Sequence, residues 1–98
     1  MIEADCQIAV LYVSLHIPQA ASLKDKRMAI KSIKDRARVK FQVSVCEAGG
    51  QDKWQVATLA FCAVSNDGRY LDSCFQNILT MIQSYPEVEV CEHEVEFM

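Results

Sequence analysis

The chain has 98 residues, 51% of them hydrophobic and 23% charged, and a formal net charge of −3. This length suits a single domain, residues 1–98, with one buried core that needs no disulfide or metal. The longest nearly apolar run, Ile8 to Leu15, is too short to span a bilayer, and Glu3 and Asp5 stand where a secretory signal needs positive charge. These features argue against a membrane-spanning helix and a secretory signal, and we expect a soluble cytoplasmic protein.

The five cysteines point to the same compartment. They are Cys6, Cys46, Cys62, Cys74 and Cys91. Their number is odd, and they lie far apart within apolar periodic segments. This distribution predicts buried free thiols in a reducing environment and not disulfides.

The first half of the chain predicts a strand followed by a helix. Residues 6–17 alternate between two largely apolar faces, as in a strand, which Pro18 ends. Ser22, with Asp25 three residues later, then offers a helix cap, and the helix should run to about Val39. The predicted core face of this helix consists of Leu23, Ile30, Ile33 and Ala37.

The next two segments predict an antiparallel hairpin. Residues 41–47 alternate, with Phe41, Val43 and Val45 facing inward. A turn begins at Gly49 and Gly50, and residues 54–64 are apolar at both parities, which is typical of a central strand. Their short connection requires antiparallel pairing.

A second helix and a last strand complete the chain. Ser65, Asn66 and Asp67 offer cap acceptors for a helix that should end before Pro86. Residues 87–98 predict a strand that changes parity, so we expect a β-bulge near Cys91 to His93. Its five glutamates are typical of an edge strand, where charge discourages pairing with another chain.

The element order βαββαβ predicts a ferredoxin-like α+β two-layer sandwich. Right-handed crossovers place both helices on one face of a four-stranded antiparallel sheet. If Leu59 and Phe61 point toward the helices, the open face carries Ile8, Val10, Tyr12, Val56, Thr58, Ala60 and Cys62. A face this apolar is seldom left in water, so we expect a second copy of the chain to cover it.

The charges are distributed unevenly along the chain. Eight of the ten Lys and Arg residues lie between Lys24 and Lys40 with only Asp25 and Asp35 against them, which leaves this segment at +6 and the remainder at −9. Five of the cations fall within about 80° on a helical wheel and extend over about 21 Å. This basic ridge consists of Lys24, Arg27, Lys31, Lys34 and Arg38. Neither helical acid is expected on it.

Five short sequence segments resemble those of a known protein family. They are LHIP at residues 15–18, SLKDKR at 22–27, VSV at 43–45, QDKWQ at 51–55 and VSND at 64–67. Together they resemble the YlxP-like family of small bacterial proteins, also called domain of unknown function 503. The resemblance implies a bacterial source, a ferredoxin-like fold and an unassigned function. It also implies a gene that in some bacteria lies among genes for translation and ribosome maturation.

No residue set predicts catalysis, a metal site or a cofactor. Lys26 falls in the middle of the helix's apolar face, and we expect its amine to reach water past the core side chains. The remaining acid and base candidates are His16, Glu47, Asp52, Glu92 and His93, and no pair has a spacing that forces contact. Cys91 and His93 are too few for a metal.

The basic ridge supports the functional prediction. A ridge of this length can meet several phosphates, so we expect a non-enzymatic accessory protein that binds RNA or the ribosome. The predicted third strand lacks the aromatic platforms of RNA-recognition motifs, so contact would be electrostatic. Three alternatives stay open: an acidic protein partner or self-association through the acidic strand, a homo-oligomeric ligand-binding module, and a merely solvated helix face.

Overall fold

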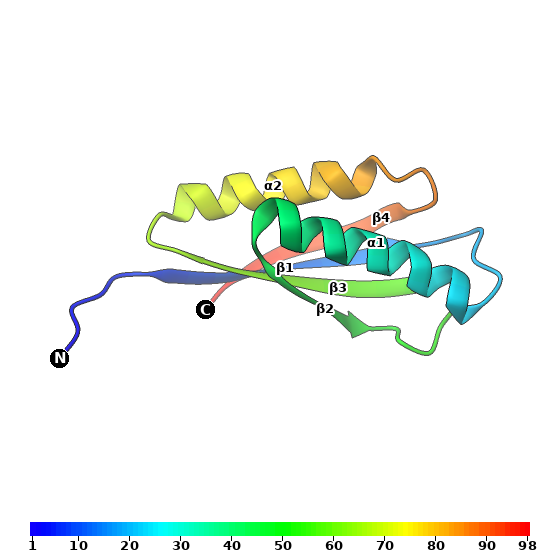
Figure 1. The fold of residues 1–98 in the computed structure, drawn as a ribbon, viewed down its shortest axis with the longest axis horizontal. Helices are drawn as coiled ribbons and strands as arrows, with labels where there is room; N and C mark the ends of the chain where they lie inside the picture. Colours follow the sequence, from blue (N-terminus) through cyan, green and yellow to red (C-terminus); the bar gives the residue numbers. More distant parts are fainter.

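Four strands and two helices form two layers in this computed structural model, which describes residues 1–98. In chain order they are β1 (Gln7–His16), α1 (Leu23–Phe41), β2 (Ser44–Gly49), β3 (Val56–Ser65), α2 (Gly68–Gln83) and β4 (Glu89–Phe97). The strands pair antiparallel in the order β2-β3-β1-β4, and both helices lie on the same face of the sheet (Figure 1). The predicted ferredoxin-like α+β sandwich is confirmed.

The core lies between the helices and one face of the sheet. Alternate residues of β1 point into it, and Leu11 lies opposite Phe61 and Val13 opposite Leu59 in the β1–β3 register. All four of these side chains are fully buried. Because facing residues of an antiparallel pair share a face, Leu59 and Phe61 point to the helices as predicted, and their even-numbered neighbours make the open face.

The ends of α1 are set by local hydrogen bonds. The Ser22 hydroxyl accepts from the Asp25 amide at 3.1 Å, and the Asp25 carboxylate accepts from the Ala21 amide at 3.0 Å. The predicted cap is therefore present. At the other end Gln42 adopts a left-handed conformation with φ 55°, and its amide donates to the Arg38 carbonyl.

The start of the second strand was predicted three residues too early. Phe41 is the last residue of α1, and β2 begins at Ser44. Phe41 lies four residues after buried Ala37, a spacing that also fits a helix face, so alternation with Val43 did not distinguish the two structures. Val43 and Val45 are buried as expected.

The predicted bulge in β4 is confirmed. Ser14 lies opposite Glu92 and Leu15 opposite Val90, which makes Cys91 the extra residue. A second register shift, not predicted, lies in β2 between Glu47 and Gly49. Both shifts occur in the two outer strands, where a bulge disturbs only one ladder.

All five cysteines are free thiols, but the expectation that they are buried is wrong for most of them. Cys74 is buried between α2 and the sheet, and burial raises the pKa of its thiol. Cys6, Cys46 and Cys91 are exposed. Cys46 and Cys91 lie in the outer strands, where only one neighbouring strand covers them.

Neither helix is both long and apolar enough to cross a membrane.

Candidate nucleic-acid interface

Most of the predicted basic ridge borders one groove. The inward face of α1 is held in the core by Ile30, Ile33 and Ala37, which turns the neighbouring flank toward edge strand β2. A groove of about 330 Å³ lies there, lined by Arg27, Ile30, Lys31, Lys34, Asp35, Arg38 and Glu47. Four of the five predicted cations therefore lie together, whereas Lys24 stands exposed at the start of the helix. We call Lys24 and these four cations the basic groove.

Asp35 corrects the expectation that the ridge carries no acid. Its carboxylate contacts the Lys31 ammonium at 2.6 Å and the Arg38 guanidinium at 3.4 Å. The hydrogen bond from Lys31, with the charges of Arg38 and Lys34, lowers the pKa of Asp35. Asp35 lies just outside the ridge on the helical wheel. It still contacts Lys31 and Arg38 because side chains three and four residues apart meet on a helix surface.

The five cations differ in whether their charge is paired with an acid. Lys24, Arg27 and Lys34 form no ion pair. Arg38 also donates to the Val45 carbonyl of β2 at 3.2 Å, which ties the helix to the sheet edge. The groove thus combines three unpaired cations with two whose charge Asp35 partly offsets, and its excess positive charge can attract phosphate oxygens.

The expectation that the Lys26 amine reaches water is wrong. Its side chain is 0% exposed. The ammonium donates to the backbone carbonyls of Gly50 at 2.5 Å, Lys53 at 2.7 Å and Val56 at 3.0 Å. Gly50 and Lys53 belong to the turn between β2 and β3, and Val56 is the first residue of β3, so Lys26 holds that turn and the start of β3 against the first turn of α1.

Glu47 supplies the charge that balances Lys26. It shares the inward parity of Val43 and Val45, and its Oε2 lies 2.8 Å from the Lys26 ammonium. The three protons of the ammonium are already used by carbonyls, so this buried oxygen receives an ionic contact without a hydrogen bond. The groove beside α1 is lined by Glu47 and not by Lys26. This pair is therefore built as a structural clamp.

The other acid and base candidates are spread over the surface. His16 Nδ1 lies 3.3 Å from a Glu89 carboxylate oxygen, a contact that the pairing of β1 with β4 brings about and that spacing along the chain did not predict. Asp52 is exposed in the β2–β3 turn. No group of three or more His, Cys, Asp or Glu residues is arranged to hold a metal ion.

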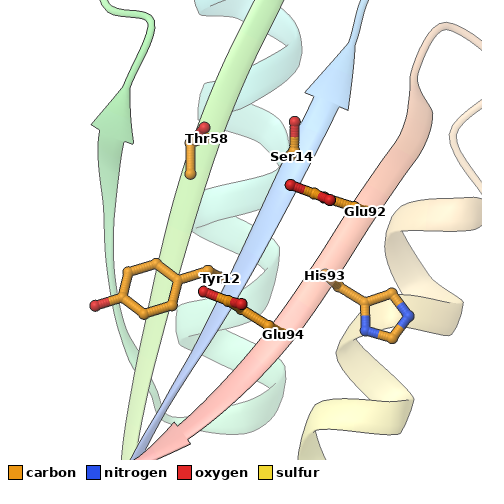
Figure 2. Close-up of a pocket in the computed structure, with 6 residues that line it drawn as sticks. All are labelled: Tyr12, Ser14, Thr58, Glu92, His93 and Glu94. Atoms are coloured by element: carbon orange, nitrogen blue, oxygen red, sulfur yellow. The ribbon is translucent and has the colours of Figure 1, made fainter.

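The open face carries an acidic column along β4. The column consists of Glu89, Glu92, Glu94 and Glu96, which lie opposite the open-face residues His16, Ser14, Tyr12 and Val10. The bulge at Cys91 makes this possible because it restores a common face to Glu89 and the three later glutamates. A shallow hollow of about 250 Å³ adjoins the column. Figure 2 shows the carboxyl groups of Glu92 and Glu94 beside β1, whereas the His93 ring lies on the other side of β4.

The charge asymmetry along the chain is therefore also an asymmetry in space. The basic groove follows α1 next to β2, and the acidic column lies on β4 at the opposite edge of the sheet. Strand order β2-β3-β1-β4 causes this separation by placing the second and last strands farthest apart. Fold and surface together define a small α+β sandwich domain with oppositely charged edges.

The chain belongs to the family described as "Protein of unknown function (DUF503)", whose sequence profile matches residues 8–95. A relative from Bacillus subtilis (strain 168), "Uncharacterized protein YlxP", is 41% identical over 73 residues, which cover 74% of this chain and 79% of the relative. The predicted family resemblance is confirmed. Neither the family description nor the relative's name assigns a reaction.

One solved structure supports the fold. The "De novo designed protein Foldit4" superimposes with a TM-score of 0.58 at 17% identity, over 94% of this chain and 96% of the designed one. At this identity the similarity concerns the fold alone. The structural-genomics protein YJCS reaches a TM-score of 0.49 at 10% identity, over 91% of this chain and 96% of its own.

Proposed function

We propose that this protein is a non-enzymatic cytoplasmic accessory protein that binds the phosphate backbone of structured RNA, ribosomal RNA in particular, through the basic groove. The observation that carries the proposal is the gathering of Arg27, Lys31, Lys34 and Arg38 along one groove beside β2. Lys24 extends the positive surface by one turn, so that it covers about 21 Å of helix. Several consecutive phosphates fit within this length.

The shape and charge of the groove favour backbone contact over base reading. A groove lined mainly by long cationic side chains can follow phosphates, and it presents few acceptors to base edges. The acidic column at the opposite sheet edge repels phosphate and so directs the groove toward the RNA. Weak sequence preference follows.

A pulldown tests this function. The wild type, immobilised at low salt, should retain at least one of three probes: intact ribosomes, separated subunits or naked ribosomal RNA. Lys24→Glu/Arg27→Glu/Lys34→Glu reverses the three cations that form no ion pair and should lose the bound probe. These residues are outside the core, so circular dichroism should show an unchanged fold.

A matched control separates the groove from net charge. Arg36→Glu/Lys40→Glu/Arg69→Glu changes the charge by the same amount elsewhere, since Arg36 lies over the Tyr85 ring and Lys40 over the Phe41 ring. This variant should bind as the wild type does. The proposal fails if the wild type retains none of the probes, or if the two variants behave alike. Retention of ribosomes without naked RNA would instead favour an acidic protein partner.

Self-association through the open face is a second candidate. Ile8 and Val64 are 43% and 63% exposed on this face. The open-face residues of β1 from Ile8 to Ser14 are uncharged, and so are the β3 residues opposite them. Two copies can stack open face to open face about a two-fold axis that lies between the sheets. If this axis runs perpendicular to the strands, the acidic column of one copy lies over the acidic column of the other. An axis along the strands places β4 over the uncharged β2 residues Ser44 and Cys46, and we propose this arrangement.

Sedimentation tests the proposed dimer. At tens of micromolar the wild type should sediment as a dimer, and Ala60→Glu, which puts a charge opposite Tyr12 in the middle of the face, should sediment as a monomer. Gln76→Glu on the exposed surface of α2 serves as the control for added charge. A monomeric wild type would refute the dimer and leave RNA binding untouched.

A further inference from the structure

The outer edge of β4 is unpaired. β4 is the last strand in the sheet order and pairs only with β1 (Figure 1). Its other edge therefore presents backbone N–H and C=O groups that can pair with an added strand. The opposite edge strand, β2, is shorter, at six residues against nine, and Arg38 already occupies its Val45 carbonyl.

The two faces of β4 differ in chemistry. Glu92, Glu94 and Glu96 point to the open face of the sheet. Val95 and Phe97 point to the helix side, since they lie opposite Leu11 and Ala9, but α2 leaves them 42% and 49% exposed. An exposed valine and phenylalanine on the helix side form an apolar surface that continues to the strand's free edge.

This pattern disfavours pairing between two copies of β4. Antiparallel self-pairing brings glutamates of one strand against glutamates of the other on the same face, which is destabilising. The same carboxylates favour a strand with cations at alternate positions. The charge on β4 therefore selects the partner and does not simply block the edge.

We propose that β4 binds an extended segment of another protein, which adds to the sheet as a fifth strand and alternates Lys or Arg with apolar residues. Its cations lie against Glu92, Glu94 and Glu96, and its apolar side chains cover Val95 and Phe97. Backbone hydrogen bonds to the free edge supply affinity, and the alternation supplies specificity. This inference is independent of RNA binding because the basic groove is at the other edge of the sheet.

Synthetic peptides test the proposal directly. The probe is a capped heptapeptide that alternates four lysines with three valines, and its control has the same composition with the lysines and valines in separate blocks. The alternating peptide should bind about tenfold more tightly by fluorescence anisotropy, because only it can place each charge against a carboxylate. Backbone amides on the free edge of β4 should become protected from hydrogen exchange in the complex.

Two variants probe the two faces of the strand. Glu92→Lys/Glu94→Lys/Glu96→Lys should abolish binding, whereas Glu3→Lys/Asp52→Lys/Asp72→Lys, with the same charge change on other exposed sites, should not. Val95→Asp should weaken binding while the glutamates remain. The proposal is overturned if both peptides bind equally well or if the triple glutamate-to-lysine variant binds as tightly as the wild type. It is also overturned if hydrogen-exchange protection appears at another site, or if a second copy of the chain protects β4 without any peptide.

Discussion

Replacing Lys26 with methionine should lower the free energy of unfolding by about 3 to 5 kcal/mol, the usual effect of breaking a buried ion pair. Methionine fills much of the same volume but leaves three carbonyls and the Glu47 carboxylate without their cation. Total stability for a domain of this size is about 5 to 15 kcal/mol, so the loss is a large fraction of it. Urea unfolding followed by circular dichroism measures it.

The matched control is Lys34→Met on the same helix, where the lysine forms no ion pair; we expect a change within about 0.5 kcal/mol. Adding Glu47→Gln to Lys26→Met should restore part of the lost stability, because it removes the uncompensated carboxylate. If Lys26→Met unfolds at the urea concentration of the wild type, the ammonium does not hold the turn.

RNA binding should weaken by about 100-fold between about 50 and about 200 mM salt. If about four groove cations contact phosphates, log affinity should fall against log salt with a slope of about −3.5. The measurement is a fluorescence-anisotropy titration with a short duplex RNA at several salt concentrations. Lys24→Glu/Arg27→Glu/Lys34→Glu should reduce the slope to about −1, since only Lys31 and Arg38 remain and Asp35 offsets part of their charge.

Asp35→Asn provides the opposite change. Asp35 is ionised at neutral pH, as any aspartate of ordinary pKa is, and there it holds Lys31 and Arg38, whose hydrogen bond from Lys31 and positive charges lower its pKa further. Removing this charge should tighten RNA binding and make the slope steeper. A slope near zero for the wild type, or weaker binding by Asp35→Asn at low salt, would show that phosphates do not occupy the basic groove.

Much of the fold follows from periodicity in the sequence. The alternation of residues 6–17 and the long apolar segment before Ser65 correspond to the two central strands, whose open-face side chains are partly shielded by a neighbouring strand on each side. The parity change after Val90 was enough to predict the bulge at Cys91. Phe41 could not be assigned from its pattern, since its spacing from Ala37 and from Val43 fits a helix and a strand equally.

The basic groove could be predicted in part. Helical geometry places Arg27, Lys31, Lys34 and Arg38 on one flank from sequence spacing alone. The packing of α1 on the sheet decides that this flank borders β2. The reach of the side chains decides that Asp35 neutralises part of its charge. Sequence periodicity contains no information on either.

The sequence by itself determined the order of elements, their inward faces and the separation of basic from acidic segments. Tertiary structure alone decided the environment of Lys26, because its three carbonyl partners lie 24 to 30 residues away and approach only when the hairpin folds under α1. It also decided that the four glutamates of β4 form one column at the sheet edge opposite β2. Strand order and register set these positions, and both result from long-range packing of the whole core.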